Sequence, residues 1–108
     1  MTVNELLKNG EFNAAALPEG DREITGVYIG DLLSWVMGRA SSGDVWITIM
    51  SNVNILAVSV LADCACVILA EGVTLDDEIL KTAEEKGVNV LLYDKSAYEA
   101  AISLSGLI

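Results

Sequence analysis

The stretch from Asp44 to Gly72 constrains the fold of this chain most. Val45–Met50 is a short run of β-branched and aromatic residues, and Cys66–Ala70 is an almost continuous apolar run. Both runs are typical of strands that are covered on both faces. A helix that starts near Asn54 separates them, so the stretch predicts a parallel βαβ unit with a right-handed crossover.

The rest of the chain repeats the same alternation of strands and helices. We expect further strands at 13–17, 24–29 and 88–92, and helices at 3–9, 32–37, 75–86 and 98–104. Short connections between alternating elements favour a parallel sheet. The sequence therefore predicts one α/β domain over residues 1–108, with a mostly parallel sheet of about five strands and helices on both faces.

Local signals predict where several helices begin and end. Thr2-x-x-Glu5 and Ser96-x-x-Glu99 have the form of capping boxes, while Gly10 and Gly87 are expected helix stops.

The second, third and fourth helices carry further signals. Asp31 is expected to cap the second helix, which Gly38 interrupts, and Thr74 is expected to open the fourth. In the third helix, the spacing predicts that Leu61 faces the core together with Ile55.

Charge and hydropathy exclude some partners and favour others. The 108 residues carry a net charge of -10, which repels phosphate backbones and anionic lipid, so neither nucleic acid nor a membrane surface is expected to bind. Hydrophobic residues make up 53% of the chain, more than a core of this size hides easily. We therefore expect a homodimer, formed through the helices near 32–37 and 55–62, with Trp35 in the contact.

Two segments invite comparison with a secretory signal and with a membrane-spanning helix, and neither fits. The start of the chain lacks a basic region followed by an apolar one, as a secretory signal would have. The apolar run Ile55–Ala70 is shorter than the roughly 20 residues that span a bilayer, and it contains Asp63. A cytoplasmic location is the expectation.

Several kinds of catalytic machinery are missing from the sequence. It contains no His, the commonest general base and metal ligand. It also lacks the Gly-x-x-x-x-Gly-Lys-Ser/Thr and Gly-x-Gly-x-x-Gly loops that cradle nucleotides. We assign no catalytic residue and no cofactor, and we do not expect the chain to be a complete kinase or dehydrogenase.

Cys64 and Cys66 are the only cysteines. One pair supplies two thiolates, whereas a structural zinc takes four nitrogen or sulfur ligands. We expect both thiols to be small buried side chains that hold no metal in the single chain.

The loops that follow the predicted parallel strands form the candidate ligand site. The carboxyl ends of such strands lie at one edge of the sheet, where helix amino ends present free N–H groups. The candidate residues are Gly30, Asp31, Ser51, Asn52, Asn54, Glu71, Gly72 and Thr74. The alternative is that these residues only cap helices.

The chain resembles the DRTGG domain family and the related amino-terminal domain of HPr kinase/phosphorylase. The resemblance rests on Asp21-Arg22-Glu23-Ile24-Thr25-Gly26, on Tyr28-Ile29-Gly30-Asp31-Leu32-Leu33-Ser34 and on Ile68-Leu69-Ala70-Glu71-Gly72. At 70–72 the chain departs from a Thr-Gly-Gly-like ending, and Glu71 would repel a phosphate there.

The resemblance implies a parallel α/β fold and a regulatory module, with a role near iron-only hydrogenase or redox-signalling machinery. We expect a non-catalytic module that senses a small ligand and acts through protein contacts. One alternative is an accessory subunit whose active or metal site is completed across a subunit interface by Cys64, Asp63, Asp31 or Glu71. The other alternative is a structural adaptor.

Overall fold

A five-stranded sheet runs through the centre of the computed structural model, which describes residues 1–9 and 11–108. The strand order is β1-β5-β4-β3-β2, and all neighbours are parallel except β1 and β5. The strands are β1 (Asn13–Ala16), β2 (Gly26–Ile29), β3 (Asp44–Thr48), β4 (Cys66–Leu69) and β5 (Val90–Leu92). The predicted mostly parallel α/β sheet is confirmed.

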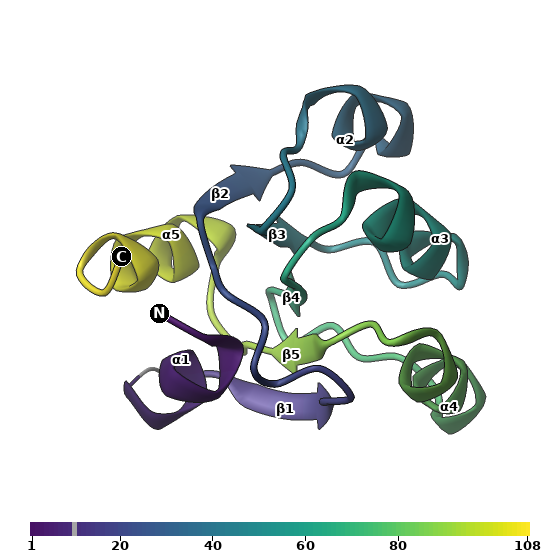
Figure 1. Cartoon of the computed structure of the whole chain (residues 1–108), viewed down its shortest axis with the longest axis horizontal. Coiled ribbons are helices and arrows are strands. Elements are labelled where there is room, and N and C mark those ends of the chain that lie inside the picture. The colour runs from purple at the N-terminus through teal and green to yellow at the C-terminus, as the bar shows by residue number, and fades with distance from the viewer. Residues whose placement is uncertain (10) are drawn as a thin grey trace.

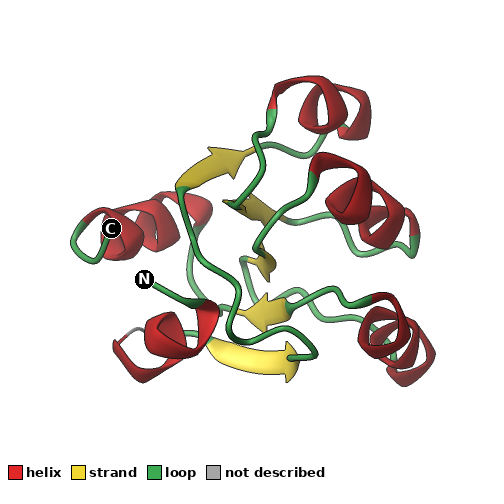
Figure 2. Ribbon diagram, viewed as in Figure 1, coloured by secondary structure: helices red, strands yellow, loops and turns green. Residues whose placement is uncertain are grey.

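Helices cover both faces of this sheet (Figure 1). On one face lie α1 and α5, and on the other lie α2, α3 and α4, as the ribbon coloured by element type also shows (Figure 2). The helices are α1 (Val3–Asn9), α2 (Leu33–Arg39), α3 (Asn54–Ala62), α4 (Asp77–Lys86) and α5 (Ala97–Ser105).

Alternation along the central strands divides the core into two layers. Val45 and Ile47 of β3 pack toward α1 and α5, whereas Trp46 between them packs toward α2 and α3. All five residues of β3 and all four of β4 are buried, as expected for strands covered on both faces. The Trp46 indole nitrogen donates a hydrogen bond to the Gly30 carbonyl at 2.8 Å, which fixes the end of β2 against β3.

The predicted capping box at Thr2 is complete, and Ser96 caps α5 as predicted, although the Glu99 carboxylate accepts from the Ser96 hydroxyl rather than from its amide. The Glu5 amide donates to the Thr2 hydroxyl while the Thr2 amide donates to the Glu5 carboxylate, and the Glu99 amide donates to the Ser96 hydroxyl. Gly87 ends α4 with a φ of 74°, in the left-handed region that favours glycine. Gly10, the expected end of α1, lies outside the described residues.

Three local predictions about helices are wrong. Asp31 does not cap α2, because its carboxylate is bonded to β3, and α2 continues through Gly38 to Arg39. Thr74 does not open α4, because the Asp76 carboxylate caps it by accepting a hydrogen bond from the Ile79 amide.

The core prediction for α3 needs one correction. Leu61 points outward and is 73% exposed, while Leu56 and Ser59 take part in the buried face instead. This helix is apolar all round, so its hydrophobic spacing could not select the buried side. Among the described residues, no helix has both the length and the apolar character needed to span a membrane.

Candidate functional site

The predicted site residues lie in the loops that follow β2, β3 and β4, and these strands are parallel to one another and to β5. These loops therefore lie at one edge of the sheet, here called the carboxyl edge. Main-chain hydrogen bonds join them in part: the Gly30 amide donates to Ile47 and the Ala70 amide to Thr48. The edge is thus a continuous platform of backbone, built from segments far apart in the sequence.

Asp31 ties the β2 loop to the end of β3. One carboxylate oxygen accepts hydrogen bonds from the Thr48 hydroxyl at 2.7 Å and from the Ile49 amide at 3.0 Å. The Thr48 hydroxyl in turn accepts from the Met50 amide. The predicted ligand residue Asp31 therefore holds the turn that leads to α3, and one of its oxygens is already occupied twice.

The turn after β4 has an unusual backbone. Glu71 and Gly72 both have positive φ angles, 61° and 73°. The Glu71 amide donates to the Lys95 carbonyl and the Gly72 amide to the Tyr93 carbonyl, at 2.8 and 3.0 Å. These bonds hold Glu71 in the left-handed region, which costs a residue with a Cβ about 1 kcal/mol, and they direct the loop toward β5.

The loop before α3 has its own local bond. The Asn52 side-chain oxygen accepts from the Asn54 amide at 2.9 Å, which forms an Asx turn at the start of the helix. Ser51 and Asn54 are exposed at the same edge. Asn52 therefore shapes the entry to α3, whereas the cap position itself is Val53, which makes no side-chain cap bond.

A cavity of about 250 Å³ opens beside the Glu71–Gly72 turn. Of the predicted ligand-binding residues, Gly72 and Thr74 line this cavity. The other lining residues are Asn13, Val73, Leu92, Tyr93 and Asp94. The exposed carboxylates Asp31, Glu71, Asp76 and Asp94 lie along the same loops. An anionic ligand would meet repulsion here, whereas a neutral or cationic one would not.

The residues of the accessory-subunit hypothesis lie at opposite edges. Asp63 and Cys64 precede β4, whereas Glu71 follows it and Asp31 follows the parallel strand β2. Burial raises the pKa of the Cys64 thiol to about 11, and it also raises that of Cys66, which is fully buried. Neither thiol is a ready nucleophile or metal ligand near neutral pH.

Among the described residues, no three Cys, Asp or Glu side chains cluster as metal ligands would. The expectation that both cysteines lie buried is confirmed. Whether the protein binds a metal stays a prediction, tested below.

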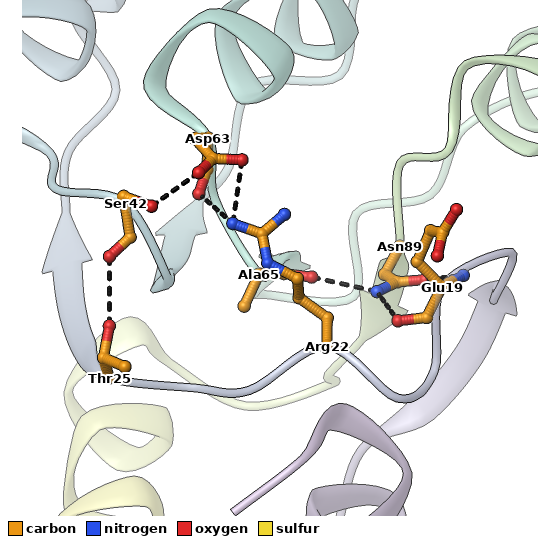
Figure 3. A network of polar contacts seen from close by, with 7 residues as sticks. All are labelled: Glu19, Arg22, Thr25, Ser42, Asp63, Ala65 and Asn89. Atoms are coloured by element: carbon orange, nitrogen blue, oxygen red, sulfur yellow. Dashed lines mark hydrogen bonds and ion pairs between the residues drawn. The ribbon is translucent and has the colours of Figure 1, made fainter.

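The sequence analysis missed a polar network at the opposite, amino edge of the sheet (Figure 3). The Arg22 guanidinium donates to the Asp63 carbonyl at 2.7 Å and pairs with its carboxylate at 2.8 Å. The Ser42 hydroxyl donates to the other carboxylate oxygen, and the Thr25 hydroxyl donates to the Ser42 carbonyl. Asp63 ends α3 with a positive φ of 59°, so this network holds the end of the helix.

Asn89 extends the network toward β1. Its amide nitrogen donates to the carbonyls of Glu19 and Ala65 at 2.8 and 2.9 Å, and its oxygen accepts from the Glu19 amide at 2.9 Å. The side chain is buried and makes all three bonds within the protein. Its position just before β5 was the only signal in the sequence, and that position does not reveal the distant partners.

The residues of the segment Asp21–Gly26 make structural contacts at the amino edge of the sheet. Asp21 accepts a hydrogen bond from the Asn4 side chain, Glu23 pairs with the amino terminus, and Ile24 is buried. A Cβ on Gly26 would lie 2.5 Å from a carboxylate oxygen of Asp44, so a larger residue would displace this carboxylate, which accepts a hydrogen bond from the Ser41 amide. The segment therefore has a structural role in joining α1, α3 and β3.

The family profile of the DRTGG domain matches residues 1–107. This chain belongs to the DRTGG domain family. No curated protein matches the chain significantly.

A solved structure with a similar fold contains the CBS and DRTGG domains of the regulatory region of a Clostridium perfringens pyrophosphatase, complexed with its activator, diadenosine tetraphosphate. The TM-score is 0.72 at 17% sequence identity, over 94% of this chain. The present DRTGG domain spans 45% of that chain. The similarity confirms the fold.

The DRTGG domain also exposes large apolar side chains, and they are unevenly placed. All of them come from the segment 27–61 and from α5 with the residue that ends the chain. They are Val27, Ile29, Leu32, Trp35, Met37, Ile49, Val53, Val60, Leu61, Tyr98, Ile102 and Ile108. Contiguous exposed apolar patches often mark protein contacts, whereas single exposed apolar residues are ordinary.

Proposed function

We propose that this DRTGG domain is a non-catalytic regulatory module, which takes a small ligand at its carboxyl edge and acts on another protein through the outer side of α3. The family match and the likeness to part of a regulatory region support a regulatory role. As the sequence resemblance implies, we place the partner in an iron-only hydrogenase or redox-signalling system, and we propose common ancestry with the amino-terminal domain of HPr kinase/phosphorylase. We expect the protein in the cytoplasm.

The observation that carries this proposal is the composition of α3. The helix contains no charged residue, and its outer side exposes Val60 and Leu61 next to Ala57. A helix that is apolar on every side is normally buried on every side. A partner that covers this side would remove the exposed surface from water, at roughly 25 cal/mol per Å² of apolar area.

The charge of the carboxyl edge supports a particular class of ligand. Glu71 and Asp94 flank the 250 Å³ cavity, and no Lys or Arg lines it. A neutral or cationic small molecule suits such a site better than a polyphosphate. We therefore do not expect diadenosine tetraphosphate, the activator in the pyrophosphatase structure, to bind this domain by itself.

A cross-linking experiment tests the protein contact. A photoreactive phenylalanine analogue replaces Leu61 on α3 or, as the matched control, the exposed Glu78 on α4. Covalent adducts are then identified from the native cells by mass spectrometry. A single heterologous protein captured at position 61 and not at position 78 supports the proposal. The same adducts at both positions, or none at 61, contradict it.

A ligand screen separates a sensor from an adaptor. Thermal unfolding is followed with a panel of neutral, cationic and phosphorylated metabolites, for the wild type and for Thr74→Arg, which fills the cavity. A compound that raises the Tm of the wild type but not of the variant identifies a sensor. No stabilising compound, together with a captured partner, favours the structural adaptor.

A further inference from the structure

β2 ends the sheet without protection. It is last in the order β1-β5-β4-β3-β2 and, in the described part of the chain, pairs with β3 alone. The segment Met1–Val3 bonds Arg22 and Ile24, which precede the strand, and leaves the outer edge of Gly26–Ile29 without a neighbouring strand among those residues. Edge strands of stable monomers usually carry charges, proline or a bulge that blocks pairing. Gly26–Ile29 has none of these, whereas β1 at the other end has a break in register between Ala14 and Ala16.

The same strand borders an apolar groove. Val27 and Ile29 lie on the α5 side of the sheet, in register with the buried Val45 and Ile47, yet they are 40% and 50% exposed. The groove has a volume of about 470 Å³, and α5 forms its other wall. Its lining residues are Gly26, Val27, Ile29, Ala101, Leu104, Ser105 and Ile108.

The helix on the other side of β2 extends past the strand. In Figure 1 the strands are stacked from β1 at the bottom to β2 near the top, and α2 lies above β2, beyond the edge of the sheet. Leu32 and Trp35 are exposed beside it. The α5 side of this edge is therefore apolar, while on the α2 side the Arg39 guanidinium stacks on the exposed Trp35 ring at 3.7 Å.

Few of the charged residues lie at this end of the sheet, which is therefore nearly neutral. Of the sixteen acidic residues, only Asp31 and Asp44 lie between Ile24 and Ala62, and Asp44 is buried. α5 carries one charge, Glu99, in its first turn. Two copies that each carry -10 repel one another least where these elements meet.

We propose that a second copy of this chain binds here, with β2 of each copy paired antiparallel about a two-fold axis to form a continuous ten-stranded sheet. A short uncharged strand is complementary to itself under this symmetry, and the new ladder satisfies the free N–H and C=O groups of both edges. The two grooves then lie side by side at the axis. A specific dimer buries about 800 Å² per partner, roughly a seventh of the 5457 Å² surface.

The outer side of α3 suits a second copy less well. It lies beside α4, in which the acidic residues Asp77, Glu78, Glu84 and Glu85 outnumber Lys81 and Lys86. Two-fold contact there would bring two such helices together. The dimer goes beyond the proposed function, because it uses a different surface and a different partner.

Cysteine cross-linking tests the dimer directly. The native thiols of Cys64 and Cys66 are buried, so a cysteine placed at an exposed position reacts selectively. Val27→Cys and Ile29→Cys are treated with a short bismaleimide, and Leu61→Cys on α3 is the matched control. We expect covalent dimers from at least one β2 variant and none from Leu61→Cys. Dimers from Leu61→Cys with none from the β2 variants would overturn the proposal.

Sedimentation equilibrium supplies a second, independent readout on the full chain. The wild type is expected to dimerise at tens of micromolar and more tightly as salt rises, because salt screens the repulsion. Ile29→Glu should be monomeric with an unchanged circular dichroism spectrum, and Leu61→Glu should remain dimeric. A wild type that is monomeric in both low and high salt overturns the proposal, whatever the photo-cross-linking at position 61 shows.

Discussion

The Arg22 guanidinium holds the end of α3 through two atoms of Asp63, its main-chain carbonyl oxygen and one carboxylate oxygen. The two residues are 41 positions apart in the chain. The contact joins the segment before β2 to the segment before β4, the two strands that flank β3 in the sheet.

This pair makes the stability of the domain sensitive to acid. The Ser42 hydroxyl, and after it the Arg22 guanidinium, lowers the pKa of Asp63 below its ordinary value of 3.8. The unfolded chain therefore takes up the proton first as the pH falls, so the stabilisation is complete above the unfolded pKa and is lost as the pH falls through the folded one.

Asp63→Asn tests this dependence, because asparagine also tolerates a positive φ. Near pH 6 the variant should be less stable in urea unfolding by about 1 kcal/mol or less, since the pair is partly exposed. The difference should shrink toward pH 3. A difference that is the same at both values would mean that the charge of Asp63 has no part in it.

Asn89 should be a larger contributor to stability. Asn89→Ala removes three hydrogen bonds and leaves two carbonyls and one amide of Glu19 and Ala65 without their partner. We expect a loss of about 2 to 3 kcal/mol in the free energy of unfolding. Asn52→Ala, which removes one bond at an Asx turn, is the control and should cost well under half as much. Equal losses would contradict the assignment.

Glu71→Gly should stabilise the fold. Glycine adopts the φ of 61° without strain, and the exposed Glu71 side chain makes no hydrogen bond to the described residues that the variant would lose. Relief of strain worth about 1 kcal/mol outweighs the freedom that glycine adds to the unfolded chain, so we expect a net gain of about 0.5 kcal/mol in chemical unfolding. Glu71→Ala keeps the strain and should show no gain, which separates backbone strain from the removal of a charge.

Both thiols should be unreactive in the folded protein. Burial raises the pKa of Cys64 to about 11 and raises that of Cys66 as well, so little thiolate forms at pH 8. Ellman's reagent should modify neither residue until denaturant is added. Elemental analysis of protein purified without chelator should find far less than one metal per chain. A stoichiometric zinc or iron signal that Cys66→Ser abolishes would favour the accessory-subunit hypothesis.

Local signals were enough to predict part of this structure. The Thr2 and Ser96 capping boxes depend on residues three positions apart, so the sequence contains all the information about them. The parallel order of β2 to β5 followed from the alternation of elements. It placed the candidate loops at one edge, where the structure has them.

The wrong prediction for Asp31 and the missed contact of Arg22 share a physical cause, which is competition from partners distant in the sequence. Asp31 could cap α2, but the Thr48 hydroxyl and the Ile49 amide occupy its carboxylate. Similarly, nothing near Arg22 in the sequence indicates Asp63. Only Gly72 and Thr74 of the predicted ligand residues line the cavity, because the twist and side-chain packing of the loops decide which of them converge.

The irregular pairing of β1 limits what this domain can build. Between Ala14 and Ala16 the register with β5 shifts, which bends that strand and leaves its outer edge a poor template for another chain. A molecule with one open edge and one blocked edge can add a copy on one side only. In the proposed dimer both β2 edges are paired, so assembly would stop at two copies and leave no open strand for fibril growth.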